Sequence, residues 1–133
     1  MTSKVIYTGS LRTEAEHLKS GAKIITDAPT DNHGKGEAFS PTDTVATALA
    51  SCMLTVMGIK AENLKVNLKG TTAEITKTMA ANPRRISKVE IAITFPETYS
   101  EETRKILENT AKTCPVLESL HLDMEKIISF NYL

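Results

Sequence analysis

The stretch SPTDTVATALASCMLTVMGIKA, residues 40–61, decides how this chain folds. Its first residues favour a helix start, because Ser40 can cap free backbone N–H groups and Pro41 suits the first helical position. Asp43 then places a carboxylate in the first turn. Beyond this turn apolar side chains recur at helical spacing, and the opposite side is apolar as well. A helix that is apolar nearly all round is a buried one, so we expect it at the centre of the domain, packed on a sheet and on a partner.

The segments before this helix combine short apolar runs with turn residues, which is typical of strands. The expected strands are Val5–Tyr7, Thr13–Leu18 and Ala22–Thr26. The polar run Asp27–Phe39 contains two glycines and a proline, so it is expected to be a loop. A loop of about a dozen residues is often functional.

The segments after the helix predict further strands and a second helix. Alternation of apolar and polar residues predicts the strands, and Asn82-Pro83 predicts the turn of a long hairpin. Ser100 is the expected cap of the second helix, and Pro115 either stops this helix or begins a short new turn. The expected elements are strands at 64–70, 72–79 and 89–95, a helix from 100 to 114 and a closing strand at 122–132.

This order of elements predicts an α+β fold with a mainly antiparallel sheet packed on a buried helix. A chain of 133 residues has the length of one domain, which we expect to span residues 1–133. The sequence has neither the regular strand–helix alternation nor the glycine-rich phosphate loop of nucleotide-binding folds.

Charge and composition exclude several classes of partner. Sixteen basic and sixteen acidic side chains leave no net charge, which gives no electrostatic reason to expect nucleic acid or an anionic membrane as partner. The lack of tryptophan and the few other aromatic residues argue against base stacking. With no apolar leader and no run of about 18–20 apolar residues, we expect a cytoplasmic protein that does not cross a membrane.

The two cysteines, Cys52 and Cys114, are too few for a disulfide scaffold. Each can be interpreted as a packing residue, since free cysteines are often buried. The chemical interpretation is a redox pair, because a reactive thiol needs a resolving thiol and groups that favour its ionised form. The N–H groups of a short helix after Cys114 would favour a thiolate there. Arg12 and Asp43 are further candidate parts of such a site.

A metal site is the weaker interpretation of the cysteines. An all-cysteine zinc site needs four thiols, and His17, His33 and His121 lack zinc-like spacing to either cysteine. We therefore expect no metal and no cofactor.

Two segments carry a family resemblance. The run Phe39-Ser-Pro-Thr-Asp-Thr-Val-Ala-Thr-Ala-Leu-Ala-Ser-Cys52 resembles the start of the central helix of OsmC/Ohr proteins. The run Ala111-Lys-Thr-Cys114-Pro-Val116 resembles the turn that holds the resolving cysteine of that family. The order and distance of the two motifs also fit, and the resemblance covers nearly the whole chain.

The resemblance implies an OsmC-like fold that forms an intertwined homodimer with two active sites at the subunit interface. It also implies a thiol-dependent peroxidase that reduces organic hydroperoxides in oxidative or osmotic stress defence. Cys52 matches the peroxidatic cysteine, and Cys114 matches the resolving cysteine that closes a disulfide with it. An external dithiol then restores both thiols.

The residues around the first cysteine depart from the family pattern. Thr42 stands where peroxidase members have the glutamate of an Asn-Pro-Glu run, and Asp43 follows one residue on. Arg12 is the best positional match for the arginine that activates the thiolate in those members, with His33 and Lys35 as substitutes.

Phe39, Met53 and Met57 are expected to make the substrate pocket apolar, which suits an alkyl hydroperoxide better than hydrogen peroxide. The alternative function is a non-catalytic OsmC-like dimer that binds a small apolar or electrophilic ligand. The cysteines would then be sensor or packing groups.

Overall fold

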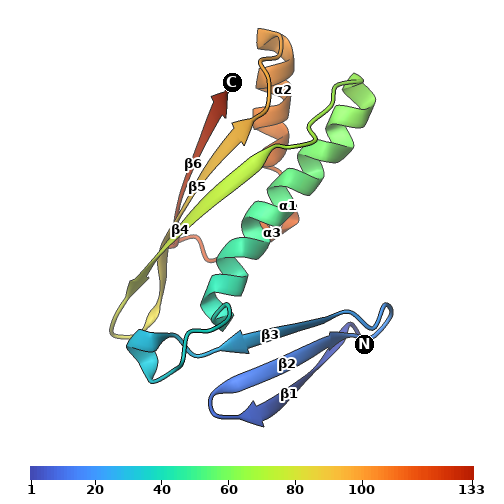
Figure 1. The fold of residues 1–133 in the computed structure, drawn as a ribbon. Helices are drawn as coiled ribbons and strands as arrows, with labels where there is room; N and C mark the ends of the chain where they lie inside the picture. Colours follow the sequence, from blue (N-terminus) through green and yellow to red (C-terminus); the bar gives the residue numbers. More distant parts are fainter. The chain divides into compact units, whose positions relative to one another are not determined.

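A computed structural model describes residues 1–133 and has an α+β architecture with two three-stranded sheets (Figure 1). The α+β class predicted from the sequence is therefore confirmed. The chain divides into two compact units, Met1–Val45 and Ala46–Leu133, which are described in turn. The expectation of a single domain over residues 1–133 stays a prediction.

The first unit holds an antiparallel sheet in the order β1-β2-β3. β1 spans Ser3–Gly9, β2 spans Arg12–His17 and β3 spans Lys23–Asp27, which confirms the three predicted strands to within a few residues. Ser10 and Leu11 make the turn between β1 and β2 and both have positive φ, at 55° and 63°. Two such residues give a hairpin turn whose twist matches that of the flanking strands.

The loop predicted after β3 is confirmed, and it folds back on the strand. Asp27 N donates to Phe39 O (3.0 Å), which ties the two ends of the loop together. The loop contains one 3₁₀ turn, η1, at Thr30–Asn32. A side chain at Gly34 would meet the Ala28 carbonyl oxygen at 1.7 Å, so only glycine fits this close approach of the backbone.

The long helix α1, Pro41–Leu64, begins as predicted. Ser40 and Asp43 cap it reciprocally: Ser40 Oγ accepts from Asp43 N (3.0 Å), and Asp43 Oδ2 accepts from Ser40 N (3.0 Å). Each bond satisfies a backbone N–H group that the start of a helix leaves free. The Asp43 carboxylate therefore has a structural task at the start of α1.

The predicted strand at 64–70 is wrong. α1 continues to the start of this segment, and the rest belongs to no sheet. The alternation that suggested a strand reflects packing, since Val66 and Leu68 lie against the core. The backbone carbonyl of Asn67 accepts a hydrogen bond from the Tyr99 hydroxyl (2.8 Å). A side-chain hydroxyl thus donates the hydrogen bond that a backbone N–H of a partner strand would otherwise donate.

The C-terminus of α1 is a Schellman motif. Val66 N donates to Ala61 O (3.1 Å), and Lys65 N donates to Glu62 O (3.3 Å). Lys65 adopts the left-handed conformation at φ 57° that this motif requires. The motif turns the chain out of the helix without the glycine that usually marks such an end in a sequence.

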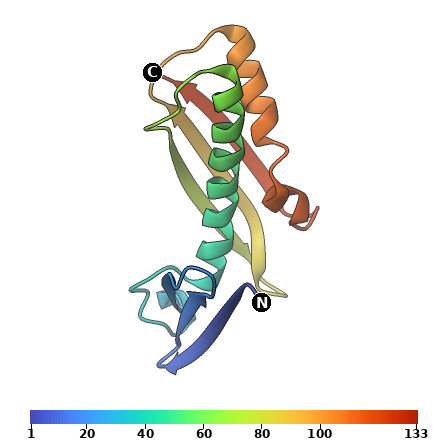
Figure 2. The ribbon, with the colours of Figure 1, turned by 90° about the vertical axis from the view of Figure 1, so that its right-hand side faces the viewer.

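The second unit holds the other sheet, in the order β4-β5-β6. β4 (Thr72–Ala80) and β5 (Arg85–Phe95) form the predicted antiparallel hairpin. β6 (Glu125–Tyr132), the predicted closing strand, pairs with β5 in parallel. The sheet is mixed because helices carry the chain back along it between β5 and β6 (Figure 2).

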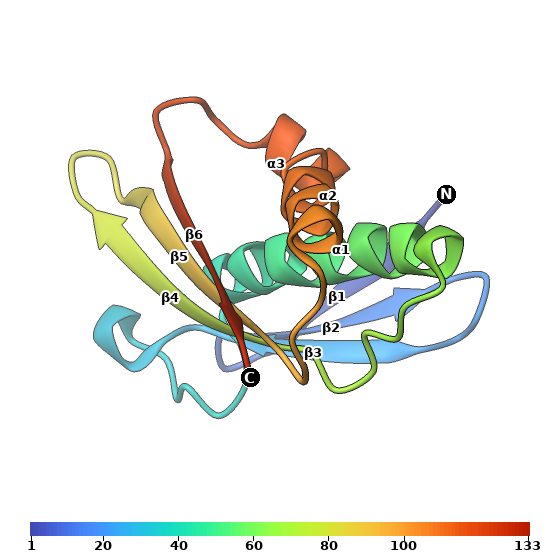
Figure 3. The same ribbon diagram turned by 90° about the horizontal axis from the view of Figure 1, so that it is seen from above.

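Two helices form this connection: α2 (Glu101–Ala111) and α3 (Pro115–Ser119). Ser100 caps α2 as predicted, since its Oγ accepts from Thr103 N (3.2 Å). Pro115 begins a short new helix, which is the second of the two alternatives expected from the sequence. Within this unit α1 and α2 lie on the same face of the β4-β5-β6 sheet (Figure 3).

The apolar core belongs entirely to the second unit. The buried apolar residues are Ala46, Leu49, Ala50, Met53, Met57, Ala61, Val89, Ile91, Ile93, Phe95, Tyr99, Leu107, Ala111 and Cys114. The buried residues of the first unit are Asp27 and Ser40, and both are polar. The first unit therefore has no apolar core of its own.

α1 is buried along one face only within this chain. Its exposed face includes Ile59, which is 61% exposed, and Val45, which is 39% exposed. By length and composition alone α1 would pass as a membrane span, with 33% of its most apolar window buried, but core helices of globular proteins pass the same test. The burial on all sides that the sequence predicted for α1 is therefore not observed within this chain. The exposed apolar face would need to pack against another protein surface to be buried.

The C-cap of α1 gives a stability prediction. Replacing Lys65 by glycine should raise the free energy of unfolding by about 1 kcal/mol, because glycine adopts positive φ without a Cβ penalty. Urea unfolding followed by circular dichroism at fixed protein concentration measures the change. Lys60→Gly, inside α1, is the matched control and should lower the same quantity by about 1 kcal/mol. A loss of stability at both positions would contradict the C-cap assignment.

Candidate functional site

Cys52 lies in the middle of α1 at the edge of its buried face. The neighbouring Leu49 and Met53 are fully buried, and Cys52 itself is half-buried and free of any disulfide. The helix thus presents this sulfur at the boundary between the core and the exposed side.

Cys114 occupies the junction of α2 and α3, where it is fully buried. It is the N-cap residue of α3, and its Sγ accepts from Leu117 N (3.4 Å). The thiol also points to the Leu49 carbonyl oxygen of α1 (4.0 Å). These two contacts fix the second sulfur between α3 and the part of α1 that carries Cys52.

Both thiols belong to one packed region, because Cys114 is part of the buried core cluster and Cys52 packs against that cluster. Burial is the main cause that raises the pKa of the Cys114 thiol, and a side-chain hydrogen bond with Cys52 raises it further. The backbone N–H groups of Leu117 and Val116 lower this pKa, but the net direction is upward. The expectation that the N–H groups of the short helix favour a thiolate at Cys114 is therefore confirmed, but burial outweighs them.

The three expected substrate-pocket residues belong to different surroundings. Met53 and Met57 are fully buried in the core of the second unit. Phe39 belongs to the first unit and is 59% exposed. Their role in lining a pocket stays a prediction.

Arg12 starts β2 and is held by two carboxylates of the first unit. Its Nε donates to Asp27 Oδ1 (2.6 Å) and its Nη2 donates to Asp27 Oδ2 (2.8 Å). Nη2 also lies 3.6 Å from Glu37 Oε1. The hydrogen bond with Arg12 is the main cause that lowers the pKa of Asp27, and the same bond raises the pKa of Arg12.

Sequence reasoning missed Asp27. It looked for the carboxylate partner of Arg12 near Thr42 and Asp43, at the start of α1, whereas strand register brings Arg12 opposite Asp27 as the last pair of β2 and β3. Asp27 directly follows the run Ile24-Ile25-Thr26 at the end of a predicted strand, which was the available signal. The catalytic roles of Arg12 and Asp43 stay predictions.

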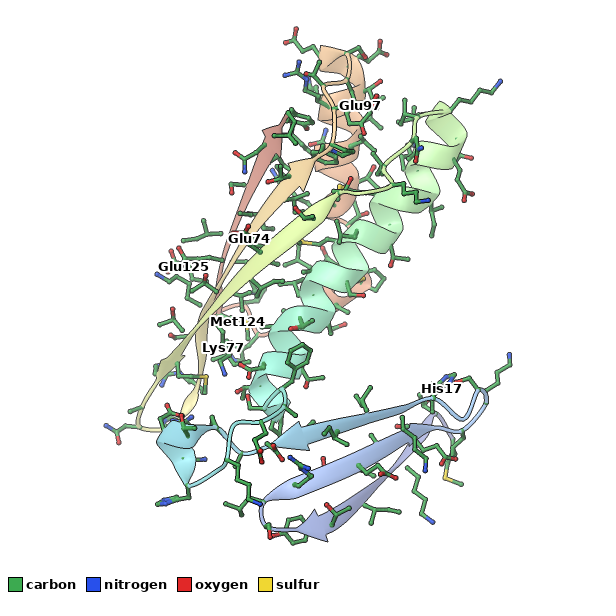
Figure 4. All side chains as sticks on the ribbon, in the orientation of Figure 1. His17, Glu74, Lys77, Glu97, Met124 and Glu125 are labelled. Carbon is green, nitrogen blue, oxygen red and sulfur yellow. The ribbon has the colours of Figure 1, made fainter.

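His17 ends β2 and His121 precedes β6, and each bonds to a close neighbour in the chain. His17, labelled in Figure 4, has its Nδ1 2.6 Å from Ser20 Oγ, and His121 Nδ1 accepts from Asp123 N (3.0 Å). No three His, Cys, Asp or Glu side chains gather in a way that could hold a metal ion.

A polar hollow lies on the open face of the second sheet. Glu74, which lines it, and the nearby Glu125 project on the side away from α1 (Figure 4). The lining residues are Glu74, Thr76, Glu90, Ile91, Ala92, Ile127 and Ser129. This hollow contains neither a thiol nor an imidazole, so the redox chemistry does not belong to it.

Comparison with protein families gives one match: the model of the family described as OsmC-like protein covers residues 34–125. This range is more than half of the chain and contains both cysteines. The chain belongs to the OsmC/Ohr family. A comparison with curated proteins finds no match.

Solved structures of the OsmC/Ohr family match nearly the whole chain. A Psychrobacter arcticus protein, whose name refers to osmotic stress and a detoxification response, is 59% identical over 98% of this chain and 95% of its own, with a TM-score of 0.95. An organic hydroperoxide resistance protein OsmC from Legionella pneumophila is 16% identical over 98% and 97%, with a TM-score of 0.76. An OsmC-like protein of unknown function from Vibrio cholerae is 16% identical over 96% of each chain, with a TM-score of 0.78. At these low identities the last two show the fold alone.

The different burial of the two thiols predicts their order of labelling. With the reduced protein at pH 8, iodoacetamide should alkylate Cys52 at least about tenfold faster than Cys114, because thiolates react and Cys114 is buried with a raised pKa. Labelling of Cys114 should rise only above its ordinary pKa of 9.0. Peptide mass spectrometry at timed quenches measures both sites. Equal rates at pH 8 would contradict this picture of the pair.

Proposed function

We propose that this OsmC/Ohr-family chain is a thiol-dependent peroxidase that reduces organic hydroperoxides with Cys52 and Cys114. The observation that carries the proposal is the packing of the half-buried Cys52 against the buried cluster that contains Cys114, whose Sγ lies 4.0 Å from the Leu49 carbonyl oxygen on the helix that carries Cys52. Two thiols that come into contact can pass between dithiol and disulfide forms, which is what a two-electron reduction of a peroxide requires.

The cycle has two bond-forming steps. The Cys52 thiolate attacks one oxygen of the hydroperoxide, the O–O bond breaks, and the alkoxide leaves as an alcohol after taking a proton from solvent. Cys52 is thereby oxidised to a sulfenic acid. The Cys114 sulfur then attacks the Cys52 sulfur, a disulfide forms, and the hydroxyl group leaves as water with the Cys114 proton. An external dithiol restores both thiols by exchange.

The environments of the two sulfurs suit these separate tasks. Cys52 is half-buried, so a small hydroperoxide can reach it. Cys114 is fully buried and its raised pKa keeps it as a thiol, so it resists direct oxidation. A protected second thiol close to the first favours disulfide formation over further oxidation of the sulfenic acid.

The family resemblance adds Arg12 as the group that activates the thiolate, and an apolar pocket from Phe39, Met53 and Met57. Arg12 is held by Asp27, which supports its assignment as a positioned rather than a freely rotating cation. Apolar side chains favour an alkyl hydroperoxide over hydrogen peroxide.

Peroxide titration with thiol counting tests the proposal. Reduced protein mixed with cumene hydroperoxide should lose about two thiols per hydroperoxide and form the Cys52–Cys114 disulfide. Cys52→Ser should consume hydroperoxide no faster than buffer. Cys114→Ser, the same change at the other sulfur, should consume about one equivalent and hold a sulfenic acid on Cys52 that dimedone traps.

An unchanged rate in Cys52→Ser would overturn the peroxidase assignment. Slow thiol loss that does not distinguish cumene hydroperoxide from hydrogen peroxide would support the alternative, a non-catalytic dimer that binds a small apolar or electrophilic ligand.

We also propose that the protein is a homodimer. Strand register places Val5, Tyr7, Ala15 and Ile24 on one face of the first sheet, and the three large ones are 61%, 64% and 57% exposed. The opposite face carries ion pairs, such as Lys23 with Glu14 (3.3 Å). A solvent-exposed apolar sheet face is typical of a protein–protein interface. The family resemblance implies that a second copy of the chain packs against this face.

Substitution of two adjacent isoleucines that lie on opposite faces of β3, Ile24 and Ile25, tests whether the chain forms a dimer through the apolar face. Light scattering at micromolar concentration should give twice the 14.5 kDa chain mass. Ile24→Lys, on the apolar face, should weaken association at least about tenfold, because a charge would be buried at the interface. Ile25→Lys, on the charged face, is the matched control and should leave the mass unchanged. A monomeric wild-type chain would contradict the proposal.

A further inference from the structure

We propose that α3 is a redox-sensitive element of the thiol site. Closing the Cys52–Cys114 disulfide withdraws the sulfur that caps this helix, and the loosened helix opens the buried sulfur to the reductant. The inference rests on the proposed function, because the disulfide is the product of its second step. All the groups involved belong to the second unit.

The start of α3 depends on one sulfur atom. Cys114 is its N-cap residue, and Cys114 Sγ accepts from Leu117 N (3.4 Å). The N–H group of Val116 also acts on this sulfur and lowers the pKa of the thiol. Pro115, the first helical residue, has no N–H group to offer. A helix start leaves its first donors without a partner inside the helix, and here the Cys114 sulfur supplies one.

Little else holds α3 in its helical form. The helix spans five residues, Pro115–Ser119, and none of them is fully buried. Val116, Leu117 and the following Leu120 pack against the buried cluster but are only partly buried themselves. A helix of one turn is marginal in water, so its stability comes from its cap and its packing. The sulfur cap is therefore a large part of what keeps these residues helical.

Formation of the disulfide changes both contacts of the Cys114 sulfur. Its thiol proton leaves, so the sulfur no longer donates toward the Leu49 carbonyl oxygen of α1 (4.0 Å). The two free sulfurs must also approach to about 2.05 Å, which is closer than non-bonded atoms lie. At least one of the sulfurs therefore moves when the bond forms.

The movement falls on Cys114 rather than on α1. α1 has 24 residues, and Leu49 and Met53, which neighbour Cys52 along this helix, are fully buried. A shift of the α1 backbone would therefore disturb the close-packed core. Cys114 instead adjoins the single turn of α3, which yields at a smaller cost in contacts. Drawing the Cys114 sulfur toward Cys52 takes it away from Leu117 N, and the helix start loses its cap.

A loosened α3 gives the external dithiol a path to the disulfide. In the dithiol form Cys114 is fully buried, which protects it from oxidants. The same burial would shield its half of a disulfide from thiol attack, because exchange needs access to a sulfur. Once the cap is lost, the first turn of α3 no longer encloses this sulfur. Reduction returns the thiol proton, and the cap forms again.

Hydrogen–deuterium exchange of the α3 amides, followed residue by residue by NMR, tests the proposal. Diamide closes the disulfide without any peroxide: the S–S bond forms, both S–H bonds break, and two electrons and two protons reduce the diamide N=N bond to a hydrazine. The amides of residues 116–120 should then exchange roughly threefold to tenfold faster than in the reduced protein, as expected for a lost cap. The amide of Thr103, which Ser100 caps in α2, should keep its rate.

Substitutions at the two cysteines separate the cap from the disulfide. Cys114→Ala removes the cap and cannot form the bond, and its residues 116–120 should exchange as fast as those of the oxidised wild type. Cys114→Ser, the matched control, keeps a capping oxygen and should exchange no faster than the reduced wild type. Cys52→Ser keeps the sulfur cap, so diamide should leave the exchange of α3 unchanged.

Several outcomes would overturn the proposal. They are equal exchange at residues 116–120 in the oxidised and the reduced protein, slow exchange in Cys114→Ala, and a failure of diamide to join the two sulfurs. A rise of the same size at Thr103 would overturn it too, because the whole unit would then be loosened.

These readings are independent of peroxide, so they separate this inference from the proposed function. A chain that reduces no hydroperoxide overturns the proposed function. If the same chain shows faster exchange confined to α3 after diamide treatment, the role of α3 as a redox-sensitive element is still supported.

Discussion

The packing of α1 on the β4-β5-β6 sheet is the contact on which the second unit depends. Leu49, Met53 and Met57 of the helix join Val89 and Ile91 of β5 in one buried cluster. Burial of such side chains contributes roughly 1.5–3 kcal/mol each, which makes this interface the main source of stability. It also sets the rotation of α1 about its axis, and so decides how far the Cys52 sulfur lies from the core.

The same packing brings the second cysteine to the first. Cys114 follows α2, which covers the same face of the sheet as α1, and its thiol points to the Leu49 carbonyl oxygen. Neither sulfur lies in a loop that could move freely. The two cysteines, 62 positions apart in the sequence (114 − 52), belong to one packed region because α1 and α2 cover the same face of the sheet.

The sequence predicted well those features that local chemistry determines. The Ser40 and Ser100 caps, the hairpin at Asn82-Pro83 and the alternation in β5 all depend on residues close together in the chain. The false strand at 64–70 has a local cause as well: alternation indicates which side chains point inward, but it does not reveal whether a partner strand exists. The end of α1 was also missed, because the left-handed residue that ends it is Lys65 and not the glycine that usually marks a helix C-terminus in a sequence.

The Arg12–Asp27 pair could not be predicted in the same way, because the register of β2 and β3 creates it across fifteen positions. The sequence also could not predict that the pKa of the Cys114 thiol is raised. It depends on the balance between burial and two backbone N–H groups, which only the folded structure determines. The ion pair depends on the distance between two residues that are remote in the sequence, and the pKa depends on the solvent exposure of the thiol.

The lack of an apolar core in Met1–Val45 has a consequence for the order of folding. The ribosome makes the β1-β2-β3 sheet before it makes any residue of the buried cluster. A three-stranded sheet with its apolar face in water is close to the limit of independent stability, so we expect these strands to remain largely unstructured while the later residues are added. These strands, synthesised before the core residues, would then become ordered after them, and newly made chains would depend on protection of their exposed isoleucine, valine and tyrosine side chains during that interval.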